Sequence, residues 1–337
     1  MRPILFLLSL LLFGGCSSKQ SSSTLLELDE GTLVVAKEYA NDMIIKNPYS
    51  LDVVGSKLLL FQSSKKDVIL EVDTADGTIV GRWGKYGNGP GEFNFPGYWG
   101  HNVSKHEIYL FDEIVGKFYV CSYEESGDSL AFTLTKEVLK PEKTVVSRGA
   151  VLDNGYAAAS AVFFQNAPIV LLDETLNVVK AFGRLAGQSE SGTDMRTYEG
   201  MVSSYGNSFV YGMKRFGYLS FYSQKDTVVQ KEWEIYLEEP LYSGEVLKCK
   251  DLKRGFVDVK MTKNYVIGSY CGRLASPKKD RGLFGYHILV FDHQGNLVRN
   301  LKLDRKIGRI AVSENEKNIY AVAYEPDICI VRYTLED

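Results

Sequence analysis

The sequence of 337 residues is poor in the residues and motifs on which several enzyme classes depend. It has five cysteines and four histidines, and the histidines do not show the spacing of zinc ligands. A Gly-x-Ser-x-Gly nucleophile motif and a Gly-Lys-Ser/Thr phosphate loop are both missing. These absences leave zinc enzymes, serine hydrolases of the nucleophile-elbow class and nucleotide-binding enzymes without support from the sequence.

Charge of one sign and long apolar runs are also scarce. Asp and Glu total 42 and Lys and Arg total 39, and the net charge of −3 is spread along the chain. This balance predicts no basic surface for a nucleic acid. The run of residues 4–13, apolar apart from Ser9, is too short to span a bilayer as a mature helix, and small residues follow it at Gly14 and Gly15. The pattern predicts a secretion signal over residues 1–15.

The residues at the end of this run, Leu12-Phe13-Gly14-Gly15-Cys16, resemble a bacterial lipobox. The resemblance implies cleavage before Cys16 and acylation of that cysteine, while a plain signal peptide with an incidental cysteine is the alternative. Residues 16–24 are mostly polar and of low complexity, which is typical of a flexible tether. We therefore expect an exported bacterial lipoprotein anchored to the cell envelope by its lipid alone, with the outer membrane as the expected site and the leaflet left open.

The remaining cysteines fall in or near apolar stretches. Cys121 and Cys329 lie inside apolar segments far apart in the chain. Cys249 and Cys271 could meet only if the loop before residue 255 folds back. We expect buried thiols, and a disulfide between Cys249 and Cys271 is the alternative.

A strand, a tight turn and a second strand recur along residues 25–337. The clearest copy is VILEVDTADGTIVGRW at residues 68–83, and weaker copies lie at residues 117–134, 168–183, 217–233, 286–301 and 328–337. A repeat of about 50 residues built from strands alone is typical of a propeller blade. We therefore expect one all-β domain, a six-bladed β-propeller of four-stranded antiparallel blades, with strand A innermost and strand D outermost.

Alternation of apolar and polar residues places the other strands. The A and B strands are expected at residues 51–54 and 57–61, 101–103 and 108–111, 149–152 and 156–161, 200–204 and 209–213, 256–261 and 265–270, and 309–313 and 319–324. The last blade ends at its C strand, residues 328–334, which would leave an unpaired edge. Residues 25–39 have strand-like content, and we expect them to supply the missing strand and close the ring.

The connection GKYGNGPGEFNFP, residues 84–96, resembles the signature of NHL-type propeller repeats and, more closely, that of TolB-like six-bladed propeller lipoproteins of Gram-negative bacteria. Its glycines permit positive φ in a sharp turn, and Phe93 is the side chain expected to fill the space between adjacent blades. The resemblance implies the fold and export, and it carries almost nothing about chemistry.

The strand order within a blade puts the A–B and C–D turns on one face and the B–C and D–A loops on the other. The long segments all belong to the second face: residues 84–97, 139–148, 183–198, 237–254 and 271–285. Long loops carry function more often than tight turns do, so the loop-rich face is the predicted binding face.

Candidate ligand-binding residues stand near the expected starts of the A strands. They are Tyr98, Trp99, His101, Arg148, Tyr198, Glu199, Arg254, Asp258 and Arg309. Aromatic and arginine side chains together suit a protein, a peptide, a glycan or an anionic small molecule, and ordinary blade packing is the alternative for any one of them. We expect a non-catalytic binding module with no cofactor.

Two other functions stay open at this point. Six-bladed propellers include calcium-dependent lactonases and esterases, with the metal in the central channel. The carboxylates that could hold Ca²⁺ here are Glu199 and Asp258, with Asn102 nearby, and this set is incomplete. A structural subunit that docks through the rim of the propeller is the third possibility.

Overall fold

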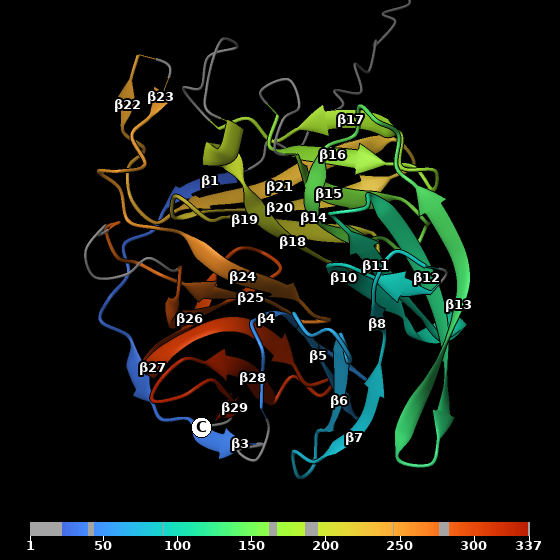
Figure 1. Cartoon of the computed structure of the whole chain (residues 1–337). Helices are drawn as coiled ribbons and strands as arrows, with labels where there is room; N and C mark the ends of the chain where they lie inside the picture. The colour runs from blue at the N-terminus through green and yellow to red at the C-terminus, as the bar shows by residue number, and fades with distance from the viewer. Residues whose placement is uncertain are drawn as a thin grey trace, which may run out of the picture.

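The computed structural model describes residues 22–39, 44–89, 91–161, 167–185, 195–244, 246–275 and 283–335. Over these residues, antiparallel blades follow one another around a ring (Figure 1). The architecture confirms the all-β propeller that the repeats predict. The expected signal, the acylation site at Cys16 and the tether up to residue 21 lie outside the described residues.

The first three blades are separate four-stranded sheets. Blade one contains β4 (Pro48–Val54), β5 (Lys57–Gln62), β6 (Ile69–Asp73) and β7 (Ile79–Trp83). Blade two contains β10 (Pro96–Asn102), β11 (Glu107–Asp112), β12 (Lys117–Ser126) and β13 (Ser129–Leu139). Blade three contains β14 (Val146–Val151), β15 (Ala157–Ala161), β16 (Ile169–Leu172) and β17 (Val178–Phe182).

The sheets that contain the last three blades have more than four strands. Blade four contains β18 (Gly200–Tyr205), β19 (Ser208–Met213), β20 (Tyr218–Lys225) and β21 (Val228–Tyr236). Blade five contains β24 (Phe256–Met261), β25 (Tyr265–Tyr270), β26 (Gly285–Asp292) and the first part of β27 (Leu297–Val312). The second part of β27 is the inner strand of blade six, before β28 (Asn318–Ala323) and β29 (Cys329–Thr334). Blades five and six are therefore one continuous sheet.

Short elements occupy the connections. They are β8 (Lys85–Tyr86), β9 (Glu92–Phe93), β22 (Tyr242–Ser243), β23 (Val246–Leu247) and the 3₁₀ turns η1 (Val103–Lys105) and η2 (Met195–Tyr198). Among the described residues, no helix is long and apolar enough to cross a membrane.

The N-terminal segment runs along the outer edges of three blades (Figure 1). β1 (Ser22–Leu25) lies parallel to β21, and β2 (Thr32–Val34) lies parallel to β27. β3 (Lys37–Tyr39) pairs antiparallel with β29 as the fourth strand of blade six, which confirms the expected closure of the ring. The expected tether was too long by three residues, because Ser22–Thr24 form backbone hydrogen bonds to a sheet edge that their polar side chains do not reveal.

The core lies between neighbouring blades. Phe93 is fully buried among side chains of blades one and two, with its ring 5.3 Å from that of Trp83 and 4.9 Å from that of Tyr119. Gly84 has φ of 78°, and a Cβ there would lie 3.3 Å from the Phe93 ring, so the turn needs this glycine for conformation and space. The expected role of Phe93 as an inter-blade plug is confirmed.

The cysteines that the structure describes are thiols. Cys121 and Cys271 are buried, whereas Cys249 and Cys329 are half-buried. The expectation of buried thiols is thus met at two positions, and the alternative disulfide between Cys249 and Cys271 is not formed. Burial raises the pKa of the Cys121 thiol to about 12, so this thiol stays protonated at neutral pH.

Candidate functional site

The inner strands β4, β10, β14, β18, β24 and the second part of β27 surround the axis of the ring (Figure 1), and we call the region around this axis the central channel. All six run in the same sense, from the long loops that precede them to the short turns that follow them. We call the end of the channel at the strand starts the loop-side mouth, and the end at the A–B turns the turn-side mouth. The predicted binding face is the one that holds the loop-side mouth.

The structure divides the predicted residues between the two mouths. His101 was expected at the start of an inner strand, but β10 already begins at Pro96, so His101 stands near its end at the turn-side mouth. The pairing of β10 with β11 shifts in register between Tyr98 and Gly100, and Gly100 has φ of 122°. This bulge breaks the alternation on which the prediction relied. His101 Nδ1 lies 2.6 Å from the Tyr98 hydroxyl.

Two of the predicted aromatic residues are built into the core. Trp99 is 1% exposed and packs between blades two and three, with its ring 4.6 Å from that of Phe111. Tyr198 is buried at the end of η2, where its carbonyl accepts a hydrogen bond from the Tyr211 hydroxyl. Both positions fit the packing alternative better than direct contact with a large partner.

Charged residues gather at the loop-side mouth. Arg148 on β14 has its Nε 3.6 Å from Glu113 Oε1 and its Cζ 5.9 Å from the centre of the Phe95 ring. Glu199, just before β18, forms an ion pair with Lys214. Burial alone would raise the pKa of Glu199, but Lys214 and then Arg148 outweigh it, and the pKa is lowered.

Arg309 lies in the wall of the channel and reaches from blade six toward blades four and five. Its Nη1 donates to Val257 O at 2.7 Å and lies 3.3 Å from Met201 Sδ. Burial lowers its pKa, and so does the neighbouring charge of Arg148, while Asp258 opposes them. Among the described residues, Arg309 has no carboxylate within ion-pair distance.

The other two predicted residues have structural contacts on the same side. The carboxylate of Asp258 is buried and accepts hydrogen bonds from the backbone amides of Ile310 and Val259, each at 3.1 Å. Arg254 precedes β24, and its amide donates to Arg273 O at 2.9 Å. The loop-side mouth therefore brings together Arg148, Glu199 and Arg309, with Asp258 in the wall and Arg254 in the loop before β24.

The nominated calcium ligands do not converge. Glu199 is engaged by Lys214 and Asp258 by backbone amides, whereas Asn102 lies at the other end of its strand. There, Asn102 Oδ1 accepts from Lys105 N at 3.1 Å and caps η1. Within the part of the chain that the structure describes, no three His, Cys, Asp or Glu side chains are grouped as metal ligands.

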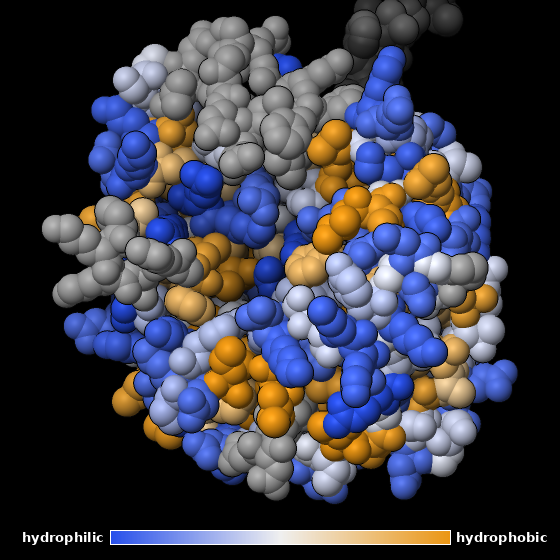
Figure 2. Space-filling view, viewed as in Figure 1, coloured by the Kyte–Doolittle hydropathy of each residue, from blue (hydrophilic) through white to orange (hydrophobic). Residues whose placement is uncertain are grey.

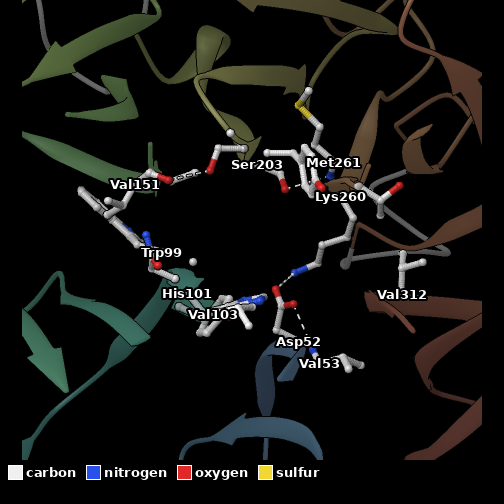
Figure 3. A pocket seen from close by; sticks show the side chains of 18 of the residues that line it. Asp52, Val53, Trp99, His101, Val103, Val151, Ser203, Lys260, Met261 and Val312 are labelled. Carbon is white, nitrogen blue, oxygen red and sulfur yellow. Dashed lines mark hydrogen bonds and ion pairs between the residues drawn. The ribbon is translucent and has the colours of Figure 1, made fainter. Parts of the chain in front are cut away.

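A cavity of about 550 Å³ opens at the turn-side mouth, where sequence reasoning placed no site. Every inner strand contributes to its lining, and an ion pair between Asp52 and Lys260 crosses it (Figure 3). The sequence analysis predicted the binding face from the length of the loops, and the turns at this mouth are short. A usable signal was nevertheless present, because Asp52 and Lys260 are charged residues in the middle of apolar inner strands, where a charge needs a partner.

Comparison with known proteins agrees with this architecture. The model of the TolB-like 6-blade propeller-like family matches residues 30–315. The chain belongs to this family. No curated protein matches the sequence.

Solved structures are similar to this TolB-like chain. A candidate exported protein of Bacteroides fragilis has a TM-score of 0.60 and 12% identity, with 94% of this chain and 99% of that chain covered. Virginiamycin B lyase of Staphylococcus aureus has a TM-score of 0.46 and 11% identity, covering 89% of this chain and 88% of that one. BamB of Moraxella catarrhalis has a TM-score of 0.39 and 12% identity, covering 85% and 69%. At 12% identity, the likeness to the Bacteroides fragilis protein extends to the fold alone.

Proposed function

We propose that this protein is an exported, non-catalytic binding module, held in the bacterial cell envelope by a lipid on Cys16. Its loop-side mouth recognises an acidic group on a protein, a peptide or a glycan. Membership of the TolB-like family supports a propeller that serves as a scaffold for interactions. The lipobox resemblance supports the envelope location, and the similar Bacteroides fragilis structure is that of a candidate exported protein.

The observation that carries this proposal is the contact set of Arg309. A guanidinium has five N–H donors arranged to hold a carboxylate or phosphate through two parallel bonds. Arg309 uses only Nη1 for these contacts, which are with the carbonyl of Val257 and the sulfur of Met201, and no described carboxylate forms an ion pair with it. A half-buried cation in that state is well placed to gain from an incoming anion.

Neighbouring charges strengthen the same preference. Arg148 is only 15% exposed and is loosely paired, since its Nε lies 3.6 Å from Glu113 Oε1. Lys214 contributes a third cation beside its ion-pair partner Glu199: burial lowers the pKa of Lys214, Glu199 opposes this shift, and Arg309 and Arg148 lower the pKa further. Mutual repulsion of three cations at one mouth is relieved when an anion binds between them.

The test measures binding of a labelled hexaglutamate peptide to the purified full chain by fluorescence anisotropy. Arg309→Met and Arg148→Met remove the charges and keep apolar stems of similar length. Each is expected to weaken binding about tenfold. Arg309→Lys is expected to weaken it less, because lysine keeps the charge but lacks the paired N–H donors of the guanidinium.

Arg82→Met is the matched control. Arg82 lies on β7 at the rim, and its side chain is 51% exposed, so its loss should leave binding unchanged. Equal binding by the wild type and the Arg148→Met, Arg309→Met double variant, with unchanged melting temperature, would refute the loop-side site. In that case the rim of the propeller becomes the surface to test.

A further inference from the structure

The turn-side cavity has the size and the walls of a small-molecule site. Its volume of about 550 Å³ falls within the range of pockets that enclose small ligands. Apolar residues share its wall with polar ones, and Val151, Met261 and Val312 are among the residues that line it (Figure 3). Such walls suit a ligand with a short apolar stem.

The deep part of the cavity is electrically balanced. Lys260 Nζ donates to Asp52 Oδ2 at 2.5 Å and to Leu51 O at 2.9 Å, so the two charges cancel. Burial lowers the pKa of His101, with Asp52 opposing the shift, and the imidazole is therefore neutral at physiological pH.

His101 leaves one ring nitrogen available. Its Nδ1 is engaged by the Tyr98 hydroxyl, and its Nε2 has no hydrogen bond to any described residue. Figure 3 shows the His101 side chain on the wall of the cavity beside Asp52. This nitrogen can donate to or accept from a hydroxyl or amine that reaches the deep part of the cavity.

The rim of the cavity is acidic. Asp153 and Glu314 are exposed, Glu316 is half-buried, and one exposed ammonium, that of Lys263, stands among them. Over the whole lining, four carboxylates face two lysines. The field at this mouth therefore attracts cations and repels anions, in contrast with the loop-side mouth.

We propose that the turn-side cavity binds a small organic cation, with its ammonium group at the acidic rim, its apolar stem along the wall that Val151 and Val312 line, and a polar end at His101 Nε2. This site is separate from the acidic-group site at the loop-side mouth. A single channel then offers two openings of opposite charge preference.

The probes are three five-carbon molecules that share a terminal hydroxyl and differ at the other end: 5-amino-1-pentanol, 1,5-pentanediol and 5-hydroxypentanoate. Methyl resonances of the full chain are followed by NMR during titration. We expect 5-amino-1-pentanol to shift the methyl signals of Val151, Met261 and Val312 with a dissociation constant of about 1 mM, which is reasonable for so small a ligand. The diol should bind about tenfold more weakly, and the carboxylate should cause no shifts.

Variants locate the site and separate charge from shape. Asp153→Asn with Glu314→Gln should reduce amine binding to the level of the diol. Val103→Arg places a guanidinium at the mouth from a position that is 58% exposed and lines the cavity, so it should abolish amine binding. The control Val228→Arg, on the outer hairpin of blade four at 62% exposure, should bind the amine as the wild type does.

Equal affinity for the amine and the diol would overturn the proposal, and so would amine binding that survives Val103→Arg. The Arg148→Met, Arg309→Met double variant should keep amine binding intact. Hexaglutamate binding tests the loop-side site and amine binding tests the turn-side cavity. Either result can therefore contradict its own proposal without affecting the other.

Discussion

Lys260 of blade five and Asp52 of blade one form an ion pair with 2.5 Å between Nζ and Oδ2, although blade six separates their blades around the ring. Their side chains are 14% and 18% exposed, and the pair crosses the channel in Figure 3. It links the blades on both sides of blade six, which is the blade that contains the ring closure. The pair is therefore expected to stabilise the closed ring as well as to set the charge of the cavity.

Loss of one partner of this pair should cost more than loss of both. Lys260→Met leaves the Asp52 carboxylate largely buried without its cation, and we expect the free energy of unfolding to fall by about 3 kcal/mol. Adding Asp52→Asn removes the uncompensated charge and should recover part of that loss. Urea unfolding of the two variants measures the difference. A double variant less stable than Lys260→Met would contradict this account of the pair.

Closure of the ring depends on Tyr39 in β3. Its ring is 6% exposed and lies 5.3 Å from that of Tyr320, and its hydroxyl donates to Asp73 O in blade one. Tyr39→Ala should therefore lower the free energy of unfolding by about 3 to 4 kcal/mol. Leu33→Ala in β2, at a side chain that is 63% exposed, is the control and should change it by less than about 0.5 kcal/mol.

Deletion of residues 22–39 tests the same closure more severely. It removes the fourth strand of blade six and exposes the edges of β21 and β27 as well. Soluble expression should be lost, because three unpaired sheet edges favour aggregation. A soluble, cooperatively folding truncated chain would show that the N-terminal strands are dispensable.

Phe93 should be among the most sensitive core positions. It is fully buried between blades one and two, and Phe93→Ala leaves a cavity that the rigid sheets on both sides cannot fill. We expect a loss of about 3 to 5 kcal/mol in urea unfolding. Tyr86→Ala in the neighbouring strand β8 changes a side chain that is 51% exposed, and it should leave the unfolding midpoint nearly unchanged.

The blades could be predicted from the sequence because the strands are short apolar or alternating segments that turn residues separate, and several of them are buried along their whole length. The prediction failed where that pattern is broken or unnecessary. The bulge at Tyr98 and Gly100 breaks alternation in β10, so the pattern does not reveal that the strand begins at Pro96 and that His101 stands near its end, at the turn-side mouth. Ser22–Leu25 are exposed and form hydrogen bonds through their backbone, so no side-chain pattern indicates β1.

The site was harder to predict than the fold for a related reason. The residues around Arg309 and Arg148 come from different blades, and the order of the strands brings their starts to one mouth. The turn-side cavity depends on where inner strands end and on which side chains are small there, such as Gly149 and Ser203. Neither feature can be recognised from neighbouring residues in the sequence. The charges of Asp52 and Lys260 inside apolar strands were the one indication of the cavity.

Stability should fall as the solution becomes acidic, because the C–D turns hold ionised carboxylates. Asp292 accepts from Asn296 N at 2.8 Å, and Asp173 accepts from Asn177 N at 3.0 Å. Burial works in the opposite direction, but these hydrogen bonds outweigh it and lower the pKa of both groups. A lowered pKa means that the contribution is present above the unfolded value near 4 and is lost as pH falls through the folded value.

The measurement is the urea midpoint of the wild type between pH 7 and pH 3. We expect it to decrease below about pH 4, and we expect Asp173→Asn with Asp292→Asn to flatten that decrease. Lys117→Met, which removes an exposed ion pair with Glu137, serves as a charge-changing control and should keep the slope. A midpoint that rises toward acidic pH would contradict the assignment of these two carboxylates.

Calcium should leave the melting temperature of the full chain unchanged, and so should a chelator. Glu199 is held by Lys214 and Asp258 by the amide of Ile310, so binding a metal would first have to break these contacts, while Asn102 lies at the opposite mouth. The check is a thermal melt with calcium and with chelator, together with the metal content of the purified protein. A stoichiometric metal and a drop of several degrees in chelator would contradict this expectation, because an ion that binds only the folded state stabilises it. That result would favour a calcium-dependent hydrolase and justify a screen of lactones and esters.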